Sequence, residues 1–214
     1  MARLFSACVV VLLLCGGRAT AEPITVTGSL VLTDEPGAFL LEGNGFSLQG
    51  EWFPSTVNGT HWFDTCRNST CNPGAPVDFG TTTYGMSVTD SQILRGTIAG
   101  TSYDELFVDA QFTFAGPQVI APDDEFGSAA GPFTMNGRLI AYLDISRTNP
   151  LLSADLIGFG TAHVAFVPNE STGGLAPIDL EYRFASTQPV PEPSTMLLVA
   201  TGLVAGVARL KKRV

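Results

Sequence analysis

The sequence predicts an all-β fold, and more narrowly an antiparallel β-sandwich of the jelly-roll-like or immunoglobulin-like kind. Three observations predict this class. Apolar and polar residues alternate with a period of two in several segments, turn-forming residues separate these segments, and no stretch shows a sustained helical period. The chain also contains 23 glycines, which suit a fold with many tight corners.

The predicted strands follow one another through the middle of the chain. In order they span residues 24–33, 46–53, 92–99, 106–114, 133–145, 158–167 and 178–184. Segment 106–114 alternates most clearly, and its two faces predict a half-buried strand. One face carries Leu106, Val108, Ala110, Phe112 and Phe114, and the other carries Phe107, Asp109, Gln111 and Thr113. Gly50 predicts a bulge or bend within segment 46–53.

Turn signals separate the predicted strands. They are Asp34–Gly37, Asn58-Gly59, Asn72–Gly74, Ala121–Asp124, Asn136-Gly137 and Asn169–Gly174. Asn, Asp, Gly and Pro favour turns because they tolerate or fix the backbone angles that turns require. Segments 54–80 and 116–131 contain no clear strand pattern and are predicted as the long loops.

The chain is predicted to have four parts. They are a signal peptide (residues 1–21), an exported β domain (22–185), a linker (186–189) and a C-terminal tail (190–214). An exported domain of this length is large enough to build one hydrophobic core.

The first 21 residues have the three regions of a secretory signal peptide. Arg3 supplies the positive charge, Val9–Leu14 the apolar region, and Ala19-Thr20-Ala21 a small-x-small cleavage site. A lipoprotein signal is the alternative, in which Cys15 would be acylated after cleavage. That processing requires a small residue where Leu14 stands, so we favour the ordinary secretory signal.

The exported part is strongly acidic. Residues 22–189 contain five arginines, no lysine and nineteen carboxylates, which gives a net charge of −14. Such a surface repels phosphate backbones, so nucleic acid is excluded as a partner, whereas cations and neutral sugars are not. The absence of lysine between these positions excludes Schiff-base chemistry.

Cys66 and Cys71 are predicted to form a disulfide. Four residues lie between them in a turn-rich segment, and the exported compartment permits oxidation. Zinc is the rival interpretation, but it requires two further ligands, and His61 is the only histidine nearby. We predict no metal and no cofactor.

No constellation in the sequence points to a catalyst. The two histidines are His61 and His163, and His163 lies within a predicted strand. No Gly-x-Ser-x-Gly motif supplies a serine nucleophile, so we predict that the protein is not an enzyme.

One aromatic group could bind sugar. Trp52, His61 and Trp62 lie close together in the sequence and are candidate glycan contacts. The alternative interpretation is a hydrophobic plug covered by the predicted disulfide.

Two acidic clusters, Asp104-Glu105 and Asp123–Glu125, could bind calcium, which prefers oxygen ligands. Their spacing matches no EF-hand loop, and a solvated loop is the default interpretation.

The C-terminal tail combines three features. Pro191, Glu192 and Pro193 are followed by an uncharged stretch at 196–208 and by a basic end, which contains Arg209, Lys211, Lys212 and Arg213. Thirteen residues reach about 20 Å as a helix, against a bilayer core of about 30 Å, so this membrane segment is short. The four cations should remain cytoplasmic as stop-transfer charges, which places the β domain outside.

This tail resembles a PEP-CTERM sorting signal. The resemblance rests on Val190–Thr195, the short apolar stretch and the Arg-Leu-Lys-Lys-Arg sequence at 209–213. It implies that an exosortase, a membrane-embedded cysteine transpeptidase, recognises the tail and cuts near the motif. It also implies an exopolysaccharide-producing bacterium with a Gram-negative type of envelope.

The sequence therefore predicts a non-catalytic exported protein, held transiently at the inner membrane and then displayed on the cell surface or in an extracellular matrix. The main alternative is a carbohydrate-binding module or adhesin that uses the aromatic group, and a remote one is a secreted hydrolase.

Overall fold

The computed structural model describes residues 22–33, 36–66, 71–87, 94–123 and 126–186. The all-β prediction is confirmed, because strands dominate these residues and the short 3-10 helix η1 (Trp62–Cys66) is the one helical element among them. The strands are β1 (Ile24–Thr25), β2 (Thr27–Leu32), β3 (Gly37–Gly43), β4 (Phe46–Trp52), β5 (Ser55–Asn58), β6 (Pro76–Asp78), β7 (Thr81–Met86), β8 (Leu94–Ile98), β9 (Thr101–Ala115), β10 (Gln118–Ile120), β11 (Gly127–Tyr142), β12 (Pro150–Asn169) and β13 (Gly174–Phe184).

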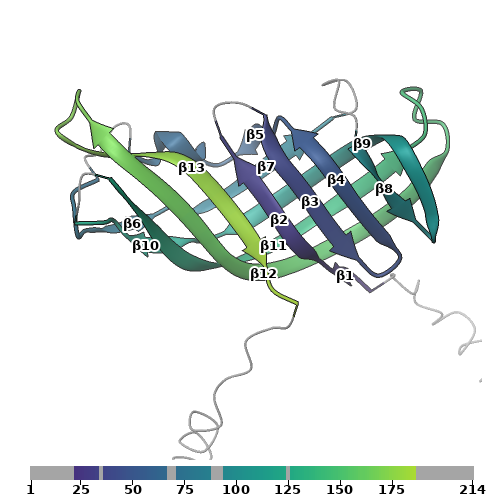
Figure 1. Ribbon diagram of the computed structural model, residues 1–214, viewed down its shortest axis with the longest axis horizontal. Helices are drawn as coiled ribbons and strands as arrows, with labels where there is room; N and C mark the ends of the chain where they lie inside the picture. The colour runs from purple at the N-terminus through teal and green to yellow at the C-terminus, as the bar shows by residue number, and fades with distance from the viewer. Residues whose placement is uncertain (1–21, 34–35, 67–70, 88–93, 124–125, 187–214) are drawn as a thin grey trace, which may run out of the picture.

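The main sheet closes on itself. Antiparallel pairing runs through β12, β13, β2, β3, β4, β8, β9 and β11, and β11 then pairs with β12 again. Figure 1 shows the resulting two layers, with β13, β2, β3 and β4 lying over β9, β11 and β12. The layers resemble a sandwich, but they belong to one hydrogen-bonded sheet, whereas jelly rolls and immunoglobulin domains have two.

Aromatic side chains join the two layers. Trp52 of β4 contacts Phe39 of β3 and Phe112 of β9, with ring centroids 5.9 and 6.2 Å apart. Phe114 of β9 stacks on Tyr182 of β13 with a centroid distance of 4.0 Å. Burial raises the pKa of Tyr182 well above its ordinary value, because the phenolate would lose its hydration.

The predicted core face of segment 106–114 is confirmed. Its five apolar residues are all buried, whereas those of the opposite face are exposed or half-buried. The strand itself is longer than predicted, because β9 begins at Thr101 in a polar stretch that pairs with β8.

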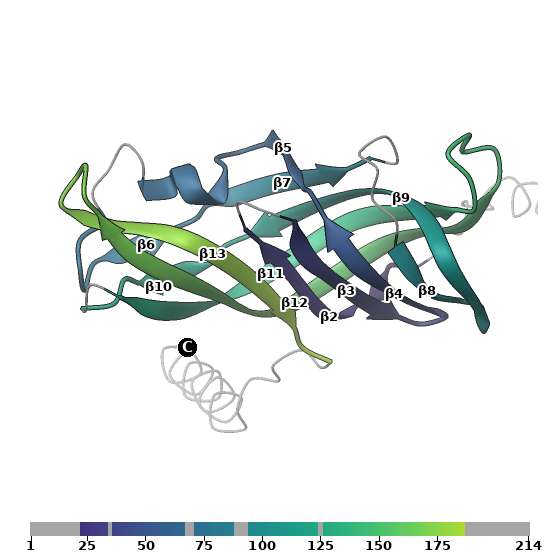
Figure 2. The ribbon, with the colours of Figure 1, turned by 45° about the horizontal axis from the view of Figure 1, so that its top comes forward.

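The remaining strands lie outside this closed ring, and three of them (β1, β5 and β7) extend the main sheet. β7 pairs with the second half of β9, and β5 pairs with β7. β6 and β10 form a separate two-stranded sheet at one end of the molecule (Figure 2). β1 pairs in parallel with β12, next to the end of β13.

Several predicted boundaries were wrong. Segment 54–80, predicted as a loop, contains β5, η1 and β6, and segment 116–131 contains β10 and the start of β11. Segment 24–33 is split into β1 and β2, and β4 pairs with β3 without a bulge at Gly50. β7 was missed because its Thr-rich sequence shows no alternation, and indeed three successive residues of it are buried.

The turn predicted at Asn136-Gly137 was also wrong, since both residues lie within β11. Close packing leaves no room for a side chain at position 137. A Cβ there would lie 2.5 Å from the carbonyl oxygen of Gln111 and 2.7 Å from a ring carbon of Phe112. The glycine therefore lets the Phe112 ring lie against the strand.

The chain enters and leaves the domain at neighbouring positions. Ile24 of β1 pairs with Leu156 of β12, and the Ala185 amide donates to the carbonyl of Phe159 on the same strand. The first and last described segments of the domain therefore contact β12 within a few residues of each other. The predicted signal peptide, the remainder of the linker and the C-terminal tail lie outside the described residues.

Candidate functional site

The predicted disulfide is confirmed. Cys66 at the end of η1 is bonded to Cys71, with their Cα atoms 5.5 Å apart, and both side chains are buried. The carbonyl of Cys71 accepts a hydrogen bond from the amide of Leu175 in β13. The disulfide therefore fixes η1 against β13, and Figure 2 shows the short blue helix beside that strand.

Two of the three candidate glycan contacts, Trp52 and Trp62, are buried and not available to a ligand, whereas His61 is half-buried. The side chain of Trp52 is 0% exposed in the core, and its indole nitrogen donates to the carbonyl of Val31 at 2.7 Å. Trp62, at the start of η1, is 2% exposed. His61 packs edge-on against Phe63 at 4.4 Å and lies 6.1 Å from Tyr84. The alternative interpretation, a hydrophobic plug, therefore describes this aromatic group, because no indole face is open to stack on a sugar.

The remaining polar candidates that the structure describes lie on separate elements. His163 lies in β12 opposite Glu181 of β13 and Ala130 of β11, as expected of a sheet residue. Asp104 and Glu105 are exposed within β9 rather than in a loop, and Asp123 is exposed. Residues 124–125 of the second acidic cluster lie outside the described part of the chain. Among the residues that the structure describes, no three His, Cys, Asp or Glu side chains converge on a metal position.

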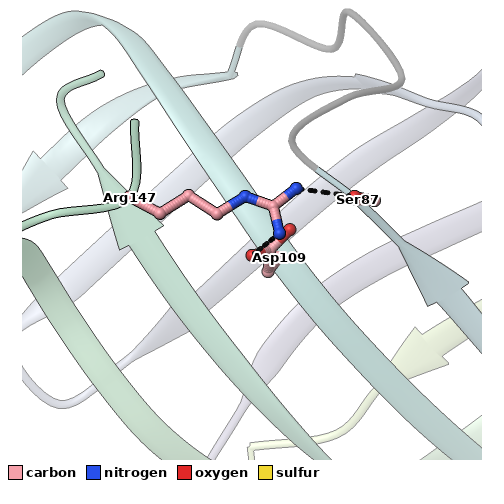
Figure 3. A network of polar contacts seen from close by, with 3 residues as sticks. All are labelled: Ser87, Asp109 and Arg147. Atoms are coloured by element: carbon pink, nitrogen blue, oxygen red, sulfur yellow. Dashed lines mark hydrogen bonds and ion pairs between the residues drawn. The ribbon is translucent and has the colours of Figure 1, made fainter. Parts of the chain in front are cut away.

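One polar network could not be predicted from the sequence. Arg147, in the loop between β11 and β12, lies 3.4 Å from a carboxylate oxygen of Asp109 on β9 and donates to the Ser87 hydroxyl at 3.1 Å (Figure 3). Arg147 adopts a positive φ of 59°, which few non-glycine residues do. The network fastens the loop to the sheet and leaves its apolar residues Leu143 and Ile145 exposed.

The outer face of β9, β11 and β12 carries a second group of polar side chains. Register places Gln111 of β9 opposite Arg138 of β11, and Arg138 opposite Asp155 of β12. In the neighbouring row lie Thr113, Asn136 and Ile157. We call Gln111, Asn136, Arg138 and Asp155 the polar track.

A shallow hollow of about 340 Å³ lies over the polar track. All four residues of the track line it, together with Pro23 and Ile157. A second hollow of about 280 Å³ adjoins it and shares Gln111 and Arg138. These positions are the polar members of strand alternation, so the sequence alone gives no reason to separate them from an ordinary solvated face.

The fold and its paired ends define a single all-β domain carried between two terminal segments. Comparison assigns the second of those segments: the family model of the PEP-CTERM protein-sorting motif matches residues 189–213. The chain therefore carries a PEP-CTERM sorting motif, which indicates an exported protein that is directed to exosortase processing and destined for the cell surface or the extracellular space. No curated protein and no solved structure matches the chain.

The matched segment contains every tail residue singled out from the sequence. They are Pro191, Glu192, Pro193, Arg209, Lys211, Lys212 and Arg213. All of them lie outside the described residues, so their individual roles stay predictions. Within residues 22–186, so far as these are described, no helix is long and apolar enough to cross a membrane.

Proposed function

We propose that this protein is a non-catalytic component of the cell surface or extracellular matrix of an exopolysaccharide-producing bacterium. In this proposal, segment 196–208 holds the precursor transiently in the inner membrane until the exosortase cuts near Pro191–Pro193. The observation that carries the proposal is the sorting motif, which occupies a tail attached to a folded domain and separable from it.

The arrangement of the chain ends supports transient tethering. The amide of Ala185 is hydrogen-bonded to β12. Nine residues separate Ser186 from Met196 at the start of the apolar segment. At about 3.5 Å per residue, these nine residues span at most about 32 Å. The domain is therefore held near the membrane, and cutting near Pro191–Pro193 frees it without breaking any strand.

Fractionation of an exosortase-positive host and of the same host without the exosortase tests the proposal. We expect the protein in the surface or matrix fraction of the first host, with an intact mass that lacks roughly the last two dozen residues. Without the exosortase it should stay in the membrane fraction at full length. A mature surface product that still ends at Val214 would contradict the proposal.

A carbohydrate-binding module or adhesin is the second candidate. The tryptophans that first suggested it are buried, but the polar track and its hollow supply a different and exposed surface. This surface favours binding over hydrolysis. Asp155 is the one carboxylate that lines this hollow, and Asp109 of the adjoining hollow is paired with Arg147.

A further inference from the structure

We propose that the polar track binds an extended neutral polysaccharide across strands β9, β11 and β12. This inference rests on the second candidate function and gives it a site other than the buried Trp52 and Trp62. The track is defined by Gln111, Asn136, Arg138 and Asp155, with Pro23 and Ile157 as its apolar border.

The register of the strands determines that the polar track runs across the sheet. Gln111, Arg138 and Asp155 occupy directly opposed positions on three neighbouring strands, so the row runs across the sheet rather than along it. Adjacent strands lie about 4.8 Å apart, and the row therefore spans about 10 Å. The adjoining hollow prolongs it past Gln111 toward Met86 and Asp109. A linear polymer can lie along such a row and contact one side chain from each strand.

The side chains of the track have unused hydrogen-bonding capacity. Arg138 and Asp155 are opposed on adjacent strands, where opposite charges commonly pair. Within the described structure, however, neither they nor Gln111 and Asn136 make a side-chain hydrogen bond or ion pair. On the neighbouring strand β13, by contrast, Arg183 donates to Glu181 at 2.6 Å. The track thus presents donors and acceptors that are directed to solvent or to a ligand.

The chemistry of these groups selects a neutral polyhydroxy ligand. The guanidinium donates only, the carboxylate accepts only, and the two amides do both, which matches sugar hydroxyls that donate and accept. A polyanion would gain from Arg138 but would meet Asp155 and a domain of net charge −14. Ile157, 40% exposed between polar neighbours, and Pro23 offer apolar surface to the C–H groups of a sugar ring.

Affinity electrophoresis of the exported protein, as its host processes it, tests the inference. The gels contain one neutral polymer each (dextran, hydroxyethylcellulose or galactomannan) or one polyanion (alginate or hyaluronan). We expect retardation by at least one neutral polymer and none by the polyanions. Substituting Arg138→Ala or Asp155→Ala should weaken that binding about tenfold or more, because each removes a charge-assisted hydrogen bond.

The Glu181→Ala and Arg183→Ala variants provide matched controls. They remove the same kinds of charge from an outer face, but from a pair that is already satisfied, so binding should stay within about twofold. Thermal unfolding of each variant checks that the fold is retained.

Three results would overturn the inference: no retardation by any neutral polymer, stronger retardation by a polyanion, or equal losses in the track and control variants. Self-association that disappears with the track variants would assign the surface to a second copy of the chain instead. Release of the protein from the membrane by the exosortase is measured separately, so failure of the binding site and failure of the proposed processing remain distinguishable.

Discussion

At the scale of single residues, neighbours in the sequence can differ completely in solvent exposure. Trp52 is 0% exposed and Phe53 is 51% exposed, because successive residues of an extended chain point to opposite faces. A tryptophan beside a phenylalanine and near a histidine suggests a sugar-binding surface from the sequence. Burial and the hydrogen bond to Val31 instead make Trp52 the centre of the contact between the two layers.

Trp52→Phe should lower the free energy of unfolding by about 1–3 kcal/mol. The change removes the hydrogen bond to the Val31 carbonyl and leaves a gap where the larger ring was. Urea unfolding followed by far-ultraviolet circular dichroism measures the loss. The control is Phe53→Ala, which should change stability by about 0.5 kcal/mol or less, because that side chain is exposed. Equal effects of the two variants would contradict the assigned core.

At the scale of elements, the disulfide determines where η1 lies. Removing it with Cys66→Ala and Cys71→Ala together should cost about 2–3 kcal/mol by the loop-entropy argument. Reductant should destabilise the natural protein by a similar amount and leave the double variant unchanged. Thiol labelling of the denatured, unreduced protein should find neither cysteine free, and stoichiometric zinc in the purified protein would contradict the pairing.

The loop between β11 and β12 should respond locally to the loss of its anchor. Arg147→Ala removes the contacts with Asp109 and Ser87, both near the surface. The free energy of unfolding should fall by less than about 1 kcal/mol, whereas amide exchange in residues 143–149 should become faster. Arg95→Ala, which removes another exposed arginine, should leave that exchange unchanged. A global increase in exchange would show that the network holds more than the loop.

The alternation of apolar and polar residues predicted the strands that have one buried face. It failed where burial of polar residues, close packing or long-range strand register determines the structure. β9 was recognised from its buried apolar series, but β7 was missed because Thr82 and Thr83 are buried beside Tyr84. Asn136-Gly137 suggested a turn, whereas the glycine makes room for Phe112. The polar track depends on the register of three strands, and no local sequence pattern predicts the register between strands that are distant in the chain.

At the scale of the whole molecule, the sorting signal and the fold constrain each other. The closed sheet is complete at Phe184, and the chain then leaves beside its own beginning at β1. A domain with neighbouring ends can be tethered at both by one membrane, first through a signal peptide and then through the tail. Local features at the two ends of the sequence predicted this plan, whereas the closure of the sheet required pairing between distant segments.

The topology of the precursor provides the last prediction. Replacing Arg209, Lys211, Lys212 and Arg213 together with neutral residues should weaken membrane retention, since a thirteen-residue apolar stretch anchors poorly alone. The precursor should then appear in the periplasm or medium with its tail uncut, because it no longer resides beside the membrane enzyme. Intact-mass measurement of the released protein distinguishes this product from the processed one, and substituting the exposed Arg95 instead leaves sorting unchanged.

Protease protection in spheroplasts tests the orientation on which this prediction depends. In cells that lack the exosortase, added protease should reach the β domain, while an epitope placed after Val214 stays protected in the cytoplasm. The physical reason is the cost of moving four clustered cations across the bilayer, which the export of the acidic domain does not require. If the epitope is digested and the domain survives, the tail does not act as a stop-transfer segment, and the order of export, tethering and release proposed for this protein is wrong.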